Sequence, residues 1–175
     1  MSYTIRPAAL QDSAAILEIY SHYVLHTTIS FEEVPPPKEE FEAKIRAARY
    51  PFLVCESADG ELVGYAYCSR HRERAGYRFS ADDSVYIAPN HHRKGIGRRF
   101  YEQLIPLLRA QGYYTIFAGV TEPNEKSVGL HESLGFQRIG TYHKVGYKQG
   151  RWCDVTWFEL PLREYGVPEE ESYVK

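Results

Sequence analysis

The chain has 175 residues, a formal net charge of −2 and a hydrophobic content of 43%, which together predict one folded domain rather than a disordered chain. The slightly acidic balance, with a pI of about 6.4, excludes a general affinity for nucleic acid, so any basic patch must be local. No apolar run approaches the roughly 20 residues that a membrane-spanning helix needs.

The cysteines and the N-terminal stretch indicate a cellular compartment. MSYTIRPA lacks the pattern of a signal peptide. Cys55, Cys68 and Cys153 are odd in number and lack metal-ligand spacing. We therefore expect reduced, mostly buried thiols in a cytoplasmic protein, and no metal site.

The first 70 residues predict one strand, two helices and a pair of strands. The strand YTIRPA ends before Pro7, and Asp12 caps a helix that reaches about Val24. TTISFEEVPPP is typical of a proline-terminated surface loop, and residues 38–48 fit a second helix. FLVCES and ELVGYAYCSR then predict two strands around an Asp-Gly turn.

The middle of the chain predicts a strand, a helix and a further strand. The first strand covers 82–88, and the helix covers 95–111, with Gly112 at its C-terminal cap. Pro106 lies inside this helix and is expected to kink it or to disturb its last turns. YYTIFAGV is strongly β-prone and predicts the next strand.

The last third predicts a helix and two strands. The helix begins at Asn124 or Ser127 and ends at LGF, and the strands cover about 137–147 and 152–160. The order β, αα, βββ, α, β, α, ββ is typical of a mixed α/β domain. The predicted boundaries are 1–162 for a single domain and 163–175 for an acidic, loosely attached tail.

A basic, glycine-containing turn joins the predicted strand to the predicted helix in YIAPNHHRKGIGRRFYEQL. In a strand–turn–helix arrangement, backbone N–H groups and the helix N-terminus can point at an anion. The alternative is an ordinary strand-to-helix turn, with glycines for tight geometry and a solvated basic rim. Spacing alone leaves both interpretations open.

Two blocks of the sequence resemble the GNAT acyltransferase superfamily. HRKGIG (92–97) resembles its [Q/R]-x-x-G-x-[G/A] motif, with His92 where Gln or Arg is usual, and NEKSVGLHESLGF (124–136) resembles its N-x-x-S…LGF element. The resemblance covers nearly the whole chain. It implies a GNAT fold, a mixed, mostly antiparallel sheet of about seven strands that is splayed at the acetyl-CoA site and flanked by about four helices.

A narrower resemblance is to the phosphinothricin and methionine sulfoximine acetyltransferases. It is carried by RERAGYRFSADDSVYI (72–87) and VGYKQGRWCDV (145–155). The family implies acetyl-CoA as the co-substrate and the α-amino group of a small amino-acid-like compound as the acceptor. It also implies a homodimer, with no nucleic acid or membrane partner. The closing match places at family positions Gly146, Lys148, Gly150, Trp152 and Asp154.

The resemblance implies that the basic turn cradles the CoA pyrophosphate. Gly95 and Gly97 would permit close approach, the helix dipole would add favourable charge, and basic side chains would screen the phosphates. The thioester would lie against backbone groups near the strand end. Asn124 would hydrogen-bond the pantetheine arm or its carrier strand, and Ser127 would meet a phosphate or cap the helix. The expected cofactor residues are Val85, Tyr86, Ile87, Arg93, Lys94, Gly95, Ile96, Gly97, Arg98, Asn124 and Ser127.

Asp82 and His131 are the expected catalytic residues. Asp82 stands where the family has a glutamate base, and its shorter reach makes a bridging water plausible; Asp83 is the second candidate. His131 stands where many superfamily members have a tyrosine near the CoA sulfur, and it would protonate the thiolate or relay a proton. The alternatives are a solvated strand-edge carboxylate and a packed core histidine.

An amino-acid acceptor also brings a carboxylate, which calls for a guanidinium group. Arg72 and Arg74 match the family's basic substrate positions, and Arg74 is the better match. Phe31 falls where the family places an aromatic ring over the substrate, and Tyr86 would line the same cavity. The alternatives are a solvated charge run and local packing of a loop aromatic residue.

Two other functions are compatible with the sequence. The first is acetyl transfer to a protein N-terminus, a lysine or a polyamine, although the paired arginines argue against a polyamine. The second is an acetyl-CoA sensor without turnover, because aspartate replaces glutamate and histidine replaces glutamine at two family positions.

Overall fold

The computed structural model describes residues 2–47 and 49–168. Helices and strands alternate along this part of the chain, with three short 3₁₀ turns marked η. The elements are β1 (Tyr3–Pro7), η1 (Leu10–Asp12), α1 (Ser13–His26), α2 (Lys38–Ala47), β2 (Phe52–Ser57), β3 (Leu62–Arg70), η2 (Ala75–Tyr77), β4 (Ser80–Ile87), η3 (Pro89–His91), α3 (Ile96–Ala110), β5 (Thr115–Thr121), α4 (Glu125–Ser133), β6 (Gln137–Lys148) and β7 (Arg151–Pro161).

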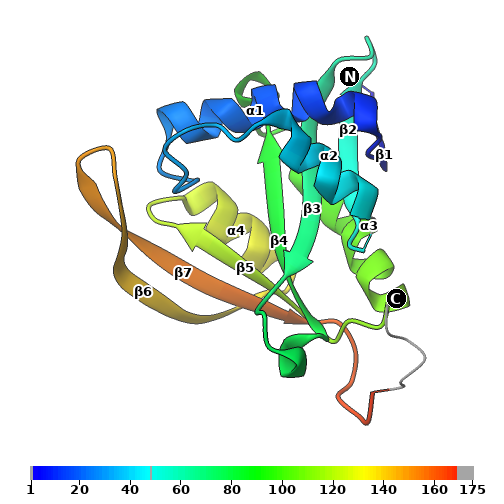
Figure 1. The fold of residues 1–175 in the computed structure, drawn as a ribbon. Coiled ribbons are helices and arrows are strands. Elements are labelled where there is room, and N and C mark those ends of the chain that lie inside the picture. Colours follow the sequence, from blue (N-terminus) through cyan, green and yellow to red (C-terminus); the bar gives the residue numbers. More distant parts are fainter. Residues whose placement is uncertain (1, 48, 169–175) are drawn as a thin grey trace.

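The described strands form one seven-stranded sheet in the order β1-β2-β3-β4-β5-β7-β6 (Figure 1). All of its neighbouring strands are antiparallel except β4 and β5. The predicted mixed, mostly antiparallel sheet with four α-helices is therefore confirmed. No helix within the described ranges combines the length and the apolar character needed to cross a membrane.

Helices cover both faces of the sheet (Figure 1). On one face, Ile16 and Ile19 of α1 and Phe41 of α2 pack with Val54 and Tyr65 of the sheet. The core on the other face lies under α3 and α4 and is larger. It includes Ile96, Phe100, Leu104, Leu108, Ile116, Ala118, Val120 and Phe158.

The sheet opens between its two parallel strands. β4 and β5 pair only at Ser80↔Thr115, Ala81↔Ile116 and Asp82↔Phe117, and beyond this point they diverge (Figure 1). β4 stays paired with β3, and β5 stays paired with β7. From Asp83 onward, the β4 backbone therefore has no strand partner on the β5 side, and this is the splay that the sequence predicted.

Of two local predictions near the N-terminus, the end of the first strand was wrong by one residue, and Asp12 is the N-cap residue of α1 only by position. β1 includes Pro7, which pairs with Leu53; β1 is an edge strand, where the missing proline N–H costs no ladder bond. Asp12 precedes α1 but does not cap it through its side chain. Its carboxylate instead accepts hydrogen bonds from Arg6 and from the Ala9 N–H at 2.7 Å.

The prediction for the long helix was partly right. α3 continues past Pro106 to Ala110, so the proline does not end it. Gly112 follows the helix with a φ of 87°, the left-handed conformation that glycine supplies at helix C-termini.

The last described residues lie against the domain. Leu162 is buried, and its N–H donates to the Tyr114 carbonyl at 2.8 Å. The Tyr165 ring stacks on Tyr114, and its hydroxyl lies 2.8 Å from Thr115 Oγ1. The first part of the predicted loose tail is thus attached, while 169–175 lie outside the described residues and the domain boundary stays a prediction.

Candidate active site

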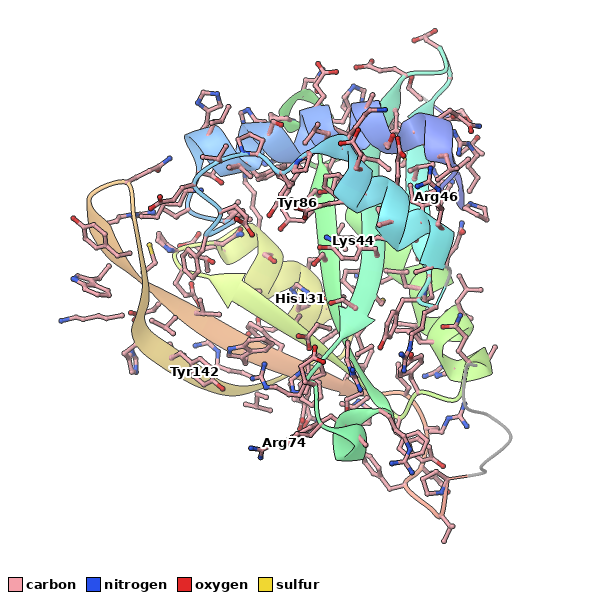
Figure 2. The ribbon with its side chains drawn as sticks, in the orientation of Figure 1. Lys44, Arg46, Arg74, Tyr86, His131 and Tyr142 are labelled. Atoms are coloured by element: carbon pink, nitrogen blue, oxygen red, sulfur yellow. The ribbon has the colours of Figure 1, made fainter. Side chains whose placement is uncertain are left out.

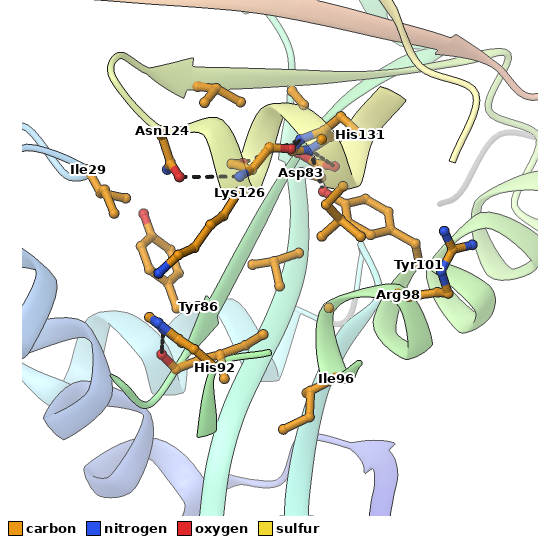
Figure 3. A pocket seen from close by; sticks show the side chains of 18 of the residues that line it. Ile29, Asp83, Tyr86, His92, Ile96, Arg98, Tyr101, Asn124, Lys126 and His131 are labelled. Carbon is orange, nitrogen blue, oxygen red and sulfur yellow. Dashed lines mark hydrogen bonds and ion pairs between the residues drawn. The ribbon is translucent and has the colours of Figure 1, made fainter. Parts of the chain in front are cut away.

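A cavity of about 610 Å³ lies where β4 and β5 diverge (Figure 3). Its lining comes from both strands beyond their last pair, from the turn before α3 and from α4. Both faces of β4 contribute, because side chains along a strand alternate. Of the predicted cofactor residues, Lys94 is outside the lining; the others line it, namely Val85, Tyr86, Ile87, Arg93, Gly95, Ile96, Gly97, Arg98, Asn124 and Ser127.

The turn before α3 has the backbone geometry of an anion site. Arg93 and Gly95 both have positive φ, 60° and 76°. The first N–H bond into the helix is Arg99 N to Gly95 O at 3.2 Å, so the N–H groups just before it are left for another acceptor. Successive N–H groups at a helix N-terminus attract anions.

The two glycines of this turn serve different purposes. A Cβ at Gly95 would meet nothing within 4 Å, so glycine is needed there for its left-handed backbone alone. A Cβ at Gly97 would lie 2.8 Å from Cδ2 of Leu130. Gly97 therefore lets α3 approach α4, a packing role that we did not predict.

His92 fastens the turn to the rest of the domain. Its Nε2 donates to the Ile87 carbonyl at 3.0 Å and lies 2.9 Å from the Tyr23 hydroxyl. Burial lowers the pKa of His92. The histidine that replaces the usual Gln or Arg is thus a neutral link between α1, the end of β4 and the turn.

Basic side chains surround the cavity mouth. Arg93 is exposed, and Arg98 donates from Nη2 to Ser133 Oγ at 2.8 Å. Lys126 of α4 also lines the cavity (Figure 3). The resulting positive rim suits a phosphorylated ligand.

Asn124 starts α4, as one of the two predicted alternatives had it. Its Oδ1 accepts the Ser127 N–H at 3.2 Å, which is a side-chain N-cap. Ser127 Oγ lies 3.4 Å from His131 Nδ1. Both predicted residues thus support the helix that carries His131, besides lining the cavity.

A buried network of Asp83, Tyr101 and His131 lies at one end of the cavity (Figure 3). His131 Nδ1 donates to the Ser127 carbonyl at 2.7 Å, so its Nε2 is free to accept the Tyr101 hydroxyl at 2.8 Å. Asp83 Oδ2 is 4.0 Å from that Nε2. This carboxylate oxygen is buried and makes no hydrogen bond within the described residues.

Burial sets the protonation of this network. It raises the pKa of Asp83 to about 7, aided by the charge of Asp82 and opposed by hydrogen bonding with Tyr101. Burial also lowers the pKa of His131. Both shifts favour the uncharged forms, a neutral His131 and a protonated Asp83.

Asp82 lies on the opposite face of β4 from Asp83 and does not line the cavity. Its Oδ1 is 2.5 Å from Nδ1 of His71. Burial raises the pKa of Asp82, and His71 and Arg72 oppose that shift. The two candidate carboxylates thus serve different sides of the sheet.

The predicted acceptor residues, apart from Tyr86, also lie outside the cavity lining. The Arg72 guanidinium sits 5.9 Å from the Trp157 ring centroid. Arg74 is exposed on the loop after β3 (Figure 2). Phe31 lies against Gly146, where a Cβ would be 2.4 Å from its ring. The structure does not bring these side chains together around one point.

Comparison with known proteins identifies the family. Residues 5–157 match the model described as an acetyltransferase (GNAT) domain. The chain belongs to the GNAT acetyltransferase family. It is 42% identical over 163 residues to phosphinothricin N-acetyltransferase of Alcaligenes faecalis, covering 91% of this chain and 82% of that protein.

Two further relatives of this GNAT domain are similar along most of their length. One is the L-methionine sulfoximine/L-methionine sulfone acetyltransferase of Salmonella typhimurium, 38% identical over 95% of this chain and 98% of that protein. The other is the crystal structure of a phosphinothricin acetyltransferase from Sinorhizobium meliloti in complex with AcCoA. It has a TM-score of 0.92 and 34% identity and covers 97% of this chain and 95% of that one.

Among the cavity residues that sequence reasoning missed in this GNAT domain are Tyr101 and Lys126. Tyr101 lies one helical turn after Gly97, so its position on the motif face of α3 was readable from the helical period. Lys126 lies between the two motif residues of α4, but only the structure shows that it lines the cavity. No group of His, Cys, Asp and Glu side chains in the described ranges is placed to hold a metal ion.

Proposed function

We propose that this protein transfers the acetyl group of acetyl-CoA to the α-amino group of a small amino-acid-like compound. The phosphinothricin, methionine sulfoximine and methionine sulfone type of acceptor is favoured by the activities for which its relatives are named. The observation that carries the proposal is the cavity at the β4–β5 splay, which has an anion-binding helix N-terminus at its mouth and a proton-holding network at its end.

In this proposal the turn before α3 holds the pyrophosphate of acetyl-CoA through backbone N–H groups, with Arg93 and Arg98 beside it. The pantetheine arm follows the opening between β4 and β5. The β4 backbone from Val85 to Ile87, which lacks a β5 partner, offers hydrogen bonds to the arm and to the thioester oxygen. Preorganised donors of this kind contribute several kcal/mol to acyl transfer.

The chemistry requires proton transfers at two places. The acceptor ammonium must lose a proton before its lone pair attacks, and the departing thiolate must gain one. We assign protonation of the thiolate to the buried network. His131 and Tyr101 would lie beside the departing sulfur, and Asp83 would store the proton. The first task falls to the other face of β4, where Asp82 lies.

Arg72 and Arg74 are assigned to the acceptor carboxylate. Arg72→Leu and Arg74→Leu are each expected to raise KM for the acceptor about 10- to 100-fold, because a charge-assisted hydrogen bond contributes about 1.5–3 kcal/mol. KM for acetyl-CoA should stay within about twofold. Steady-state kinetics with one substrate varied at a time measures both constants.

Arg46→Leu on α2 is the matched control, because it also removes one arginine charge. Arg46 is outside the cavity lining and pairs with Glu42 of the same helix at 3.1 Å. It should leave both constants unchanged. If both loop variants keep the acceptor KM of the unmodified chain, the carboxylate is bound elsewhere.

A homodimer and a cytoplasmic location are further parts of the proposal. The β6–β7 hairpin exposes Ile139, Tyr142, Val145, Tyr147 and Trp152, each at least half exposed, and apolar surface of this kind favours association. Sedimentation is expected to give twice the chain mass, and Trp152→Glu is expected to shift it toward the monomer. A monomer at micromolar concentration would contradict the dimer. Three free, buried cysteines support a reducing compartment.

The activity is tested by thiol release from acetyl-CoA with a panel of acceptors. The panel contains phosphinothricin, methionine sulfoximine, methionine sulfone, ordinary amino acids, spermidine and short peptides. Turnover concentrated on the first three supports the proposal. Turnover mainly on spermidine or peptides would replace the acceptor class, and tight acetyl-CoA binding without turnover would favour a sensor.

A further inference from the structure

A histidine–aspartate pair lies where the sheet begins to open. His71 directly follows β3, and its Nδ1 is 2.5 Å from Asp82 Oδ1. Its ring stacks on Phe117, with centroids 4.3 Å apart and planes 20° from parallel. Asp82↔Phe117 is the last registered pair between β4 and β5. The imidazole therefore lies over the last pair before the strands diverge.

This pair lies on the face of the sheet opposite the proton-storing network. Along β4, Asp82 shares a face with Ser84 and Tyr86, and both of those residues line the cavity. Asp83 points to the other face, toward Tyr101 and α4. The cavity thus reaches both faces, and the His71–Asp82 pair, which is outside the lining itself, lies on the same side of β4 as Ser84 and Tyr86.

The hydrogen bonding of the imidazole leaves one nitrogen available. Nδ1 faces the Asp82 carboxylate and carries the proton that it donates. Nε2 makes no hydrogen bond with any described residue, and the His71 side chain remains 12% exposed. An imidazole held through Nδ1 by a carboxylate, with a free lone pair on Nε2, has the arrangement of a general base.

We propose that His71 Nε2 takes the proton from the acceptor ammonium and that Asp82 is the residue that positions His71. This inference rests on the proposed N-acetyltransferase activity and names the base within it. Asp82 is one methylene shorter than the glutamate of related sequences, and the imidazole bridges the distance that the shorter side chain cannot. Asp82 accepts the hydrogen bond from Nδ1 and so holds the ring.

The proton balance is complete. Nε2 accepts one proton from the ammonium, which leaves a neutral amine and an imidazolium. The amine forms the new C–N bond to the thioester carbon, and the C–S bond breaks. The second proton of the amine nitrogen ends on the thiolate sulfur, and the imidazolium returns its proton to water.

The groups around His71 are consistent with this cycle. Asp82 from β4 faces Nδ1, the Tyr77 ring from η2 packs edge-on at 5.8 Å, and Arg72 is the next residue in the chain. Phe117 and Trp157, from β5 and β7, supply uncharged walls. The carboxylate stabilises the imidazolium, and His71 and Arg72 oppose the rise that burial causes in the pKa of Asp82.

The test uses His71→Gln, His71→Phe, Asp82→Asn and the double variant His71→Gln/Asp82→Asn in the full chain. Gln retains a hydrogen-bond donor, and Phe retains the stacking on Phe117, so a merely structural His71 would tolerate one of them. We expect both to lower kcat for methionine sulfone by about 100-fold or more, with KM for acetyl-CoA within about twofold. The double variant should be no slower than the single variants, because the two residues act as one unit.

Two further measurements separate a base from a packing residue. His71→Ala should regain activity when imidazole is added to the buffer. His131→Ala, which removes the histidine of the buried network with Asp83, should not. The acid limb of kcat/KM against pH should be present in the unmodified chain and absent in His71→Gln. His143→Gln is the matched control, since His143 pairs with Asp154 at 3.0 Å on the exposed β6–β7 hairpin, and it should keep full activity.

The assignment would be overturned if His71→Gln or His71→Phe kept more than about a third of the normal kcat. The clearest such result would be an active His71 variant beside an inactive Asp82→Asn. In that case Asp82 acts as the base itself while the N-acetyltransferase activity stands. Absence of turnover by the unmodified chain with every acceptor would overturn both this inference and the proposed function. Equal thermal unfolding of all variants excludes misfolding as the cause of lost activity.

Discussion

Asp83→Asn is expected to stabilise the folded chain above pH 7 by as much as about 4 kcal/mol. Asp83 is buried with an unpartnered Oδ2, and its pKa is raised from 3.8 to about 7. The folded chain therefore binds this proton more tightly than the unfolded chain does. The stabilising contribution is complete below about pH 4, decreases as the pH rises toward 7, and is absent above it.

Urea unfolding at several pH values between 5 and 8, and at lower pH for the control, measures this effect in the absence of acetyl-CoA. The unmodified chain should lose free energy of unfolding across that range, and Asp83→Asn should lose much less. Asp12→Asn is a control of opposite sign, since Arg6 lowers the pKa of Asp12. That variant should be less stable than the unmodified chain at pH 7, and the difference should shrink as the pH falls below 4. Parallel pH profiles for the unmodified chain and Asp83→Asn would contradict the account.

Lys148→Met is expected to lower the free energy of unfolding by about 2–4 kcal/mol. Lys148 is buried in β6, and its Nζ donates to the carbonyls of Val24 and Ser30, both at 2.6 Å. Methionine keeps an unbranched, flexible side chain that is one atom shorter, and it leaves both carbonyls unpaired. These carbonyls belong to the end of α1 and to the loop after it. Loss of the two hydrogen bonds therefore also loosens the segment that contains Ile29, a residue of the cavity lining.

The same variant should raise KM for the acceptor more than KM for acetyl-CoA, since the turn before α3 is held independently by His92. Lys38→Met is the matched control: it removes an exposed pair with Glu42 at 3.1 Å, and surface pairs contribute about 0–1 kcal/mol. Equal free energies of unfolding for the two lysine variants would show that the hydrogen bonds of Lys148 to Val24 and Ser30 do not stabilise the fold.

Local sequence signals predicted the parts of the site that one segment builds alone. The strand, the glycine turn and α3 follow each other directly, so this arrangement could be predicted from the sequence, while spacing alone left its role as an anion site open. Asn124 was one of two predicted starts of α4, and the structure selects it. The resemblance to GNAT sequences added the splay, which no single segment specifies.

The remaining features depend on which segments meet in space. Alternation along β4 predicts that Asp82 and Asp83 face opposite sides, but not that His71 lies over one and Tyr101 over the other. Likewise, lysine is usually found on the surface. The burial of Lys148 follows only from the contact of β6 with the loop after α1. The close approach of Leu130 to Gly97 could not be predicted either, because Leu130 belongs to α4, a helix distant from Gly97 in the sequence.

The central claim is acetyl transfer from acetyl-CoA to an α-amino nitrogen, and the position of the label in the product tests it most directly. Acetyl-CoA labelled with ¹³C at the carbonyl is incubated with the protein and methionine sulfone labelled with ¹⁵N at the α-amino group. The account predicts a product with one-bond ¹³C–¹⁵N coupling, formed in proportion to the thiol released. Thiol release with the ¹³C recovered as free acetate, or bonded to any atom other than the α-nitrogen, would contradict it.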